Sequence, residues 1–109
     1  MAKFLAVFTG TPGAGARPDA ATEARGMAAW GEWMQRHAGS VLDGGGPLGK
    51  TKKVSKSGIQ DASNHLAGFV VVEAESHDDA ARMFEGHPHF TIFPGDGVDV
   101  MPVMPIPGA

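Results

Sequence analysis

Two short runs of the chain are apolar on both faces of a strand, and they constrain the fold more than any other feature. Lys3–Thr9 reads KFLAVFT, and Ala67–Ala74 reads AGFVVVEA. Side chains alternate between the two faces of a strand, so a strand buried on one side only alternates apolar with polar residues. These runs do not alternate in that way. We therefore expect both faces of the sheet that contains them to be covered.

A long helix is predicted between these two strands, over Pro18–Ala38, after a glycine-rich loop at Gly10–Ala16. Asp19 suits the N-cap of this helix and Gly39 the position just past its end. Apolar residues recur in it at helical spacing, which predicts a stripe that packs against the sheet. The expected stripe consists of Met27, Trp30, Met34 and Ala38, with Trp33 widening it or lying at its edge.

A second, shorter helix is predicted over Ser76–Glu85, directly after the second apolar strand. Ser76 and Asp79 form a capping box at its start, because each side chain can bond the backbone N–H of the other residue. A short strand is expected over Ser40–Asp43 and a last strand over Gly97–Val103. The chain thus contains four strands and two helices in a definite order.

That order is strand, helix, strand, insertion, strand, helix, strand. It predicts a ferredoxin-like α+β fold (βαββαβ), in which two helices cover one face of an antiparallel sheet. The other face is apolar as well, and the sequence predicts no further helix for it. A second copy of the chain is the simplest cover. We therefore expect a homodimer formed through the sheet faces.

Length, charge and composition exclude several classes of function. The 109 residues suit a single domain spanning residues 1–109. Nine basic and twelve acidic residues give a net charge of −3, which argues against nucleic acid as a partner. The chain has no cysteine, which excludes disulfides and thiolate chemistry. No apolar run approaches the ~18 residues of a membrane span, so we expect a cytoplasmic protein with no membrane partner.

The stretch Asp43–Thr51, DGGGPLGKT, matches the phosphate-loop pattern over Gly44–Thr51. Such a loop binds phosphate because a helix N-terminus stands directly behind it. The residues after Thr51 have no apolar helical stripe and are interrupted by Gly58. We therefore expect no nucleotide to bind here. Gly44–Gly49 is instead predicted to be a turn. The segment Thr51–Gln60 is predicted to be an exposed hairpin or an irregular insertion.

Taken in order, the motifs resemble those of the YCII-related proteins, especially the branch named for its Asp-Gly-Pro-Phe motif. The matching segments are KFLAVFTG, a tryptophan-bearing helix, LDGGGPL, GFVVVEAESHDDAARMF, GHPHF and VDVMPV. At Asp43–Leu48 the motif carries extra glycine, and leucine replaces phenylalanine. The resemblance covers nearly the whole chain. It implies a dimeric α+β barrel with a cleft beside the sheet in each subunit.

Some YCII-related proteins look like small enzymes that use a histidine–aspartate pair, and one has a dehydrochlorinase-type role. In these members the histidine lies on the first helix, and the aspartate precedes a proline after the second helix. Here the first helix carries only His37, at its far end, and the residue before Pro88 is His87. The resemblance places His87 at a catalytic position, but the pair itself is not matched residue by residue.

The segment His87–His89, HPH, is the strongest candidate site. In an extended segment residues two apart point to the same side, so both imidazoles are expected to face one cavity. Imidazole titrates near neutral pH, which suits proton transfer, and Asp43 or Asp61 could orient it. Alternatively, the two histidines bind a metal with His65 or Asp43 as a third ligand. A third possibility is an ordinary surface or dimer contact.

Two functions suit this site. The first is an enzyme that uses histidine acid–base chemistry on a small organic acid or enol. The second is a non-catalytic module that binds a small molecule or a partner through the same cleft. The residues assigned to catalysis are His87, His89 and Asp43, and those assigned to substrate binding are Trp30, His65 and Asp61. No cofactor is expected, and no residue is assigned to a metal.

Overall fold

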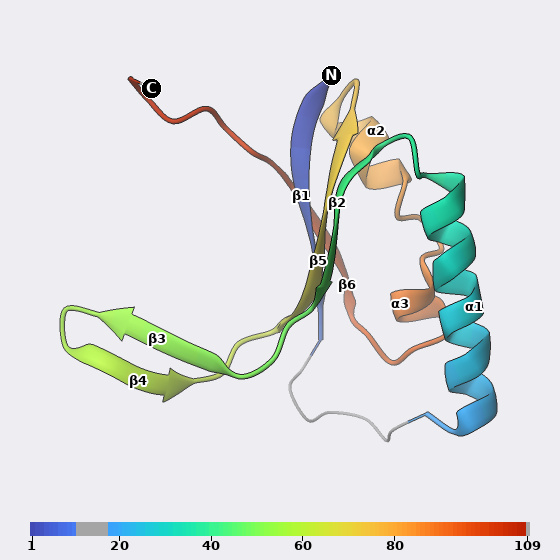
Figure 1. The fold of residues 1–109 in the computed structure, drawn as a ribbon, viewed down its shortest axis with the longest axis horizontal. Coiled ribbons are helices and arrows are strands. Elements are labelled where there is room, and N and C mark those ends of the chain that lie inside the picture. Colours follow the sequence, from blue (N-terminus) through green and yellow to red (C-terminus); the bar gives the residue numbers. More distant parts are fainter. Residues whose placement is uncertain (11–17, 109) are drawn as a thin grey trace.

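A computed structural model describes residues 1–10 and 18–108, and its elements follow the predicted order (Figure 1). In chain order they are β1 (Ala2–Thr9), α1 (Ala20–Arg36), β2 (Val41–Pro47), β3 (Thr51–Ser55), β4 (Gly58–Ala62), β5 (Leu66–Ala74), α2 (His77–Arg82), α3 (Pro88–Thr91) and β6 (Gly97–Pro102). The loop predicted over Gly10–Ala16 lies, apart from Gly10, outside the described residues. Among these residues, no helix combines the length and apolar character needed to cross a membrane.

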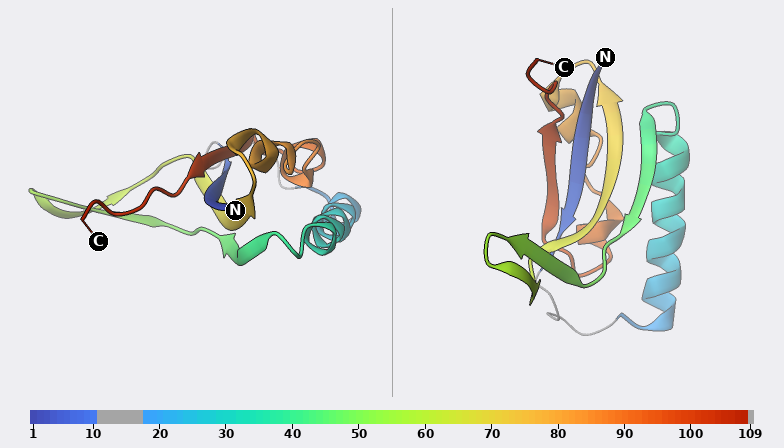
Figure 2. Two further views of the ribbon diagram at one scale, coloured as in Figure 1. Left: turned by 90° about the horizontal axis from the view of Figure 1, so that it is seen from above. Right: turned by 60° about the vertical axis from the view of Figure 1, so that its left-hand side comes forward.

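Four strands form one antiparallel sheet in the order β2-β5-β1-β6, which the right-hand view of Figure 2 shows. With α1 and α2 as the two crossover helices, this is the ferredoxin-like topology. The helices lie on one side of the sheet (Figure 1). The predicted α+β fold class is therefore confirmed.

The sheet face toward the helices, which we call the closed face, carries the hydrophobic core. Its side chains alternate along β1 and β5 as strand geometry requires. The buried core residues are Phe4, Ala6, Phe8, Val70, Val72 and Ala74 from the strands and Trp33, Ala80 and Phe84 from the helical side. The Trp33 Nε1–H donates to the Met83 carbonyl at 2.7 Å, so the one polar group of this buried indole is satisfied.

Helix α1 begins as predicted, and its buried side matches the predicted stripe in part. The Asp19 carboxylate accepts the Thr22 N–H at 2.7 Å, which confirms the predicted N-cap. Trp33 is buried, whereas Met27 is 59% exposed. Trp30 and Met34 of the predicted stripe do pack against the core. Gly26 is buried as well and was not predicted, because it has no side chain to signal its burial.

The C-terminal end of α1 also differs from the prediction. The helix ends at Arg36 with His37 as its C-cap, so Ala38 lies past the helix and is exposed, and Gly39 is not the cap. The start of α2 is as predicted, because the Ser76 hydroxyl accepts the Asp79 N–H at 3.1 Å. The sequence predicted both helix starts correctly, because an N-cap is an interaction between residues that are close together in the sequence.

Strand β2 extends through the glycines that were predicted to form a turn. It pairs with β5, and its register shifts between Val41 and Asp43 and again between Asp43 and Gly46. Gly45 has φ 62°, and a side chain there would collide with the Phe69 carbonyl, so this bulge requires glycine. The Gly44–Thr51 segment therefore runs along β2 into β3. A strand follows it in place of the helix that a phosphate loop requires.

The insertion forms the hairpin that was one of its two predicted forms. Strands β3 and β4 pair with each other and extend away from the main sheet (Figure 1). Val54 and Ile59 face each other across this hairpin, and each is 74% exposed.

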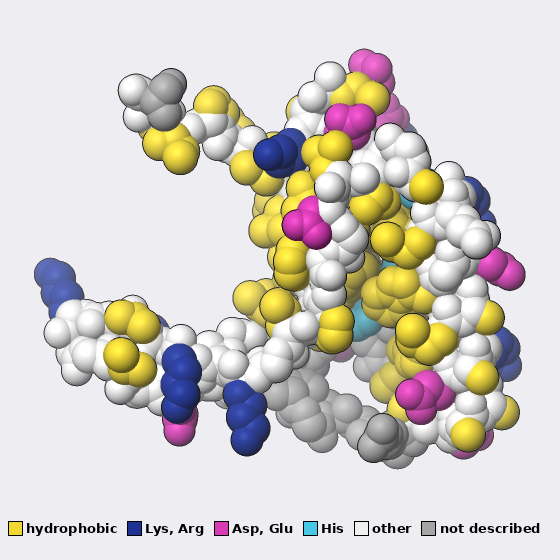
Figure 3. Space-filling view, in the orientation of Figure 1, with side chains coloured by type: hydrophobic (Ala, Val, Ile, Leu, Met, Phe, Trp, Pro, Cys, Tyr) yellow, Lys and Arg dark blue, Asp and Glu magenta, His cyan; other side chains and the backbone are white. Residues whose placement is uncertain are grey.

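The sheet face away from the helices, which we call the open face, is apolar and partly exposed. By the register of the strands it carries Leu5, Val7, Phe69, Val71 and Met101. No helix of the described chain covers it. Figure 3 shows apolar side chains along this side of the sheet, facing the β3–β4 hairpin.

Candidate functional site

A pocket of about 350 Å³ lies between α1, strand β2 and the region of α3. We call it the aromatic pocket, and it corresponds to the hollow between α1 and the sheet in Figure 3. Its lining includes Phe8, Trp30, Met34, Val70, His89 and Phe93. The space stays open because β2 contributes glycine there. A Cβ on Gly44 would lie 3.6 Å from the Met34 Cε, which also lines the pocket.

His89 is the one ionisable side chain among the described residues that line the aromatic pocket. Its Nε2 lies 2.8 Å from the Thr9 carbonyl oxygen. A carbonyl only accepts, so Nε2 carries the proton and donates, which leaves Nδ1 unprotonated in the neutral ring. Gly95 packs against the ring, and a side chain there would collide with it. Position, tautomer and orientation of His89 are therefore fixed by the fold.

His87 lies beneath the pocket wall rather than in its lining. The predicted extended HPH segment is wrong, because Pro88 begins the short helix α3 and His87 is its N-cap. The His87 Nδ1 accepts the His89 backbone N–H at 3.0 Å. Pro at the first position of a helix and an accepting side chain before it both favour this turn. The two imidazoles therefore occupy different environments, instead of facing one cavity together.

Aromatic rings surround the His87 imidazole, which is 0% exposed. The ring centroids of Trp30 and Trp33 lie 4.6 and 5.1 Å away, and the Trp30 ring is nearly perpendicular at 89°. The Nε2 has no hydrogen-bond partner among the described residues. Burial, together with smaller contributions from the neighbouring His89 and His37, lowers the pKa of His87 to about 4. His87 is thus neutral at neutral pH.

The other residues predicted for the site lie apart from the aromatic pocket, except Trp30, which lines it. Asp43 is exposed, and its carboxylate accepts the Gly45 N–H at 2.9 Å, which is the arrangement of a turn-capping aspartate. His65 is exposed in the loop before β5, and its backbone carbonyl accepts the Gly10 N–H. Neither Asp43 nor His65 lines a cavity described here.

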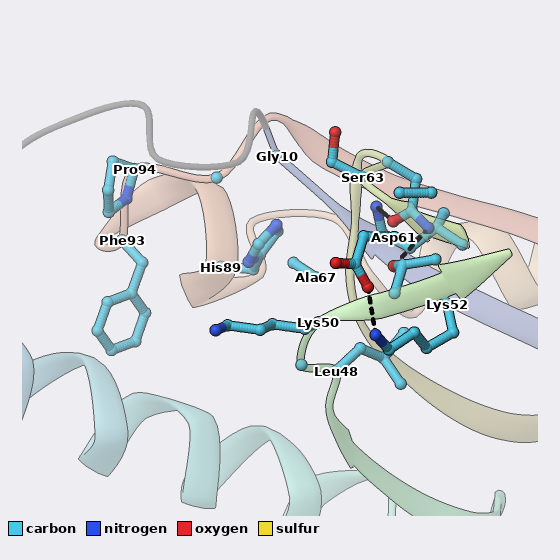
Figure 4. Close-up of a pocket in the computed structure, with 16 residues that line it drawn as sticks. Gly10, Leu48, Lys50, Lys52, Asp61, Ser63, Ala67, His89, Phe93 and Pro94 are labelled. Atoms are coloured by element: carbon cyan, nitrogen blue, oxygen red, sulfur yellow. Dashed lines mark hydrogen bonds and ion pairs between the residues drawn. The ribbon is translucent and has the colours of Figure 1, made fainter. Parts of the chain in front are cut away.

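A second, more open cavity of about 760 Å³ adjoins the aromatic pocket. We call it the lysine groove. It lies at the base of the hairpin and is lined by Lys50, Lys52 and Asp61 among others. Lys52 forms an ion pair with Asp61 (Figure 4). Asp61 is therefore in a cavity lining, as predicted, but it belongs to the groove.

Sequence reasoning missed three contributors to the site: Phe8, Phe93 and Lys50. Phe8 was assigned only to a strand, and Lys50 was given no part in the site. Phe8 is an aromatic residue at the end of a buried strand, and this signal could have identified it. No local signal identifies Phe93 or Lys50, because both reach the site through the folding of distant segments.

The described residues also bear on the metal alternative. Within residues 1–10 and 18–108, no three histidine, aspartate or glutamate side chains cluster closely enough to hold a metal ion. One nitrogen of each imidazole is already engaged, because the His87 Nδ1 accepts a backbone N–H and the His89 Nε2 donates to a carbonyl.

Comparison with known proteins supports the fold. No protein-family model matches the chain, and no curated protein matches it. A similar solved structure is 5-chloro-2-hydroxyhydroquinone dehydrochlorinase from Burkholderia phenoliruptrix AC1100, in complex with 2,5-dihydroxybenzoquinone. The two chains are 20% identical with a TM-score of 0.56, over 91% of this chain and 90% of that chain. At this identity the likeness shows a shared ferredoxin-like α+β fold.

Proposed function

We propose that this chain binds a small planar organic molecule in the aromatic pocket and that His89 exchanges a proton with it. One observation carries the proposal: within the part of the chain that the structure describes, a single ionisable side chain lines an otherwise apolar cavity of about 350 Å³. Cavities of this size, with a few polar groups among aromatic side chains, are typical of small-molecule sites.

The aromatic side chains favour a flat ring as the ligand. Phe8 and Trp30 lie 4.9 Å apart between ring centroids, and Trp30 and Phe93 lie 6.1 Å apart. Rings at such distances offer both faces and edges to a planar guest. The ligand would gain most of its affinity by burying apolar surface against these rings.

His89 is suited to accept a proton from a ring hydroxyl. The Thr9 carbonyl holds its Nε2–H, so the unprotonated Nδ1 is the atom that takes the proton. The resulting imidazolium keeps the hydrogen bond to Thr9. His87 remains neutral and accepts the His89 N–H, so its role is to position the backbone of His89.

The structural neighbour supports the same class of ligand. Its substrate is a substituted hydroquinone, and its structure holds a benzoquinone. We propose on this basis and on the resemblance of the motifs that the chain is a YCII-related protein, and that it acts on a phenolic or quinoid ring. The alternative is a module that binds such a ring without turnover. The two functions differ in whether the bound ring loses a proton to His89.

We further propose that a second copy of the chain covers the open face of the sheet. Leu5, Val71 and Met101 leave apolar surface there, and Met101 is 39% exposed. The hairpin and the C-terminal segment both extend on this side (Figures 1 and 2). Partly exposed apolar patches of this kind are typical of protein interfaces.

A spectroscopic titration with 4-nitrophenol tests the site. The probe is a small planar ring whose ionised form absorbs visible light, so it reports binding and proton loss separately. We expect the wild-type protein to bind it and to favour the ionised form. In His89→Gln, binding should persist while the ionisation of the bound probe returns to that of the free probe. Binding without any His89-dependent ionisation would favour the non-catalytic module.

A pocket-filling variant locates the binding. Gly44→Leu places a side chain between β2 and Met34, and φ at Gly44 is not in the left-handed region. We expect it to weaken 4-nitrophenol binding at least about tenfold. The matched control is Gly31→Leu, at an exposed position of α1 that lines neither cavity. Equal binding by both variants would show that the aromatic pocket is not the site.

A further inference from the structure

We infer that the ring ligand carries an anionic group and that Lys50, in the lysine groove, binds it. The inference rests on the proposed function, because it requires the ring to occupy the aromatic pocket. It adds the chemical class of the ligand and the residue that selects it. The ligand is an aromatic or quinoid ring with a carboxylate or another oxyanion substituent.

The two cavities adjoin each other. Ala67, His89 and Phe93 line both the aromatic pocket and the lysine groove. A molecule that enters the aromatic pocket from the groove therefore passes His89 and Phe93. One end of such a molecule would lie among the aromatic rings and the other end would remain in the groove.

The Lys50 side chain extends toward this junction. Figure 4 shows its ammonium directed toward His89 and Phe93, while the neighbouring Lys52 points to Asp61. All of these residues line the groove. A lysine side chain has three donors on a flexible stem, and it serves as a point charge for anions.

The charges of the two cavities are unequal. Among the described residues, the charged side chains that line the groove are Lys50, Lys52 and Asp61, and Lys52 and Asp61 form an ion pair. Among the described residues Lys50 forms no ion pair, and no carboxylate lines the aromatic pocket. One positive charge is therefore left at the mouth of an apolar cavity, which favours an anion over a neutral or cationic group.

Two polar residues of the groove, Thr51 and Asn64, are already engaged in internal hydrogen bonds. The Asn64 amide donates to the Thr51 hydroxyl at 3.1 Å, and its carbonyl accepts the Leu66 N–H at 2.9 Å. These groups are used in holding the hairpin base to β5. Lys50 is thus the charged donor in the groove that remains available for a ligand.

This arrangement orients the ligand. With its anionic group on Lys50 and its ring among the aromatic side chains, the middle of the molecule lies beside His89. A hydroxyl at that position is the group whose proton His89 would accept. Lys50 would therefore act as a specificity-determining and positioning residue, and His89 as the proton acceptor.

A matched pair of ligands tests the inference. 4-Hydroxybenzoate and 4-hydroxybenzamide share the ring and the hydroxyl, and they differ in the charge of one substituent. Isothermal titration calorimetry at low salt should show that wild-type protein prefers the carboxylate, by about tenfold for one charge-assisted contact. Lys50→Met should abolish this preference while leaving the affinity for the amide unchanged.

The control variant is Lys53→Met, which makes the same charge change on the same hairpin at an exposed position outside the groove. It should retain the preference, which excludes an effect of net charge alone. The preference should also shrink as salt rises, because the contact is partly exposed.

The two proposals fail in different ways. If the wild-type protein binds both ligands and Lys50→Met keeps the preference for the carboxylate, the role of Lys50 is disproved and the proposed function stands. If wild-type protein binds both ligands equally, an anionic ligand is disproved. If neither ligand binds, and 4-nitrophenol does not bind either, the proposed function itself fails.

Discussion

The two faces of the sheet carry similar apolar residues, but the face toward the helices is more deeply buried than the open face. On β5, Val70 and Val72 are buried under the helices, whereas Val71 between them is partly exposed on the open face. Nothing in the identity of these valines predicts the difference. It arises because α1, α2 and α3 all lie on one side of the sheet (Figure 2). The crossover connections therefore decide which side chains are buried. An apolar strand by itself does not indicate which of its faces the helices will cover.

The closed face is also not uniformly closed. Near β1 and β5 it is filled by side chains such as Phe4 and Val72. Near β2 the glycines supply no side chains, and the aromatic pocket occupies the space below α1. The same face therefore provides stability at its centre and a cavity at its edge.

The largest expected effect on stability is at the centre of the closed face. Trp33→Ala removes a buried indole and its hydrogen bond to the Met83 carbonyl, and should lower the free energy of unfolding by about 3–5 kcal/mol. Urea denaturation followed by circular dichroism measures this. The control Met27→Ala, at an exposed position of the same helix, should change it by less than about 0.5 kcal/mol. Similar losses in both variants would contradict the assignment of the core.

The next effect concerns pH and the burial of His87. Its folded pKa of about 4 lies below its ordinary value of 6.5, so between these values the unfolded chain binds a proton that the folded chain does not. Stability from this group is present above pH 6.5 and is lost as the pH falls toward 4, by up to about 3 kcal/mol. Urea denaturation across this range measures the loss.

Two variants isolate His87 from the other titrating groups. His87→Asn keeps a side chain that caps a helix but cannot take up the proton, so the loss of stability between pH 6.5 and 4 should be smaller. His65→Asn, at an exposed position, should leave the profile of the wild-type protein unchanged. If His87→Asn loses as much stability between pH 6.5 and 4 as the wild-type protein, the folded protein accommodates the charged His87 ring.

The smallest expected effect on the folded chain is on the open face. Val71→Lys places a charge on the apolar surface that we assign to a second copy, and should convert a dimer to a monomer. The free energy of unfolding of the monomer should fall by only about 1 kcal/mol, because this face is partly exposed in the single chain. Sedimentation velocity measures the association state. Met27→Lys, on the helical side, should remain dimeric, and a monomeric wild-type protein would contradict the proposed dimer.

The local elements of the fold were predictable because local interactions form them. Asp19 and Ser76 cap helices through bonds to residues three positions away. The strands that became β1 and β5 were visible as apolar runs, and the order of elements indicated the ferredoxin-like arrangement. The glycines of β2 were misread as a turn, because a bulged edge strand and a glycine turn share the same composition.

The candidate site was only partly predictable. His89 and Trp30 were identified in advance, and the structure places both in the lining of one pocket. The prediction that His87 faces the same cavity as His89 was wrong, because Pro88 begins a helical turn and rotates the two imidazoles apart. Phe93 and Lys50 were not identified, because their contribution depends on segments that meet only after folding.

The sequence by itself determined the class of fold, the helix starts, and the apolar character of both sheet faces. These follow from side-chain periodicity and from contacts between near neighbours. The tertiary structure decided which face the chain covers itself, where a cavity remains, and which polar groups surround it. The hydrogen bond from His89 to Thr9 joins residues 80 positions apart, and the bond from Trp33 to Met83 joins residues 50 positions apart. Contacts at that separation leave no periodic trace in the sequence, because they depend on how whole elements pack.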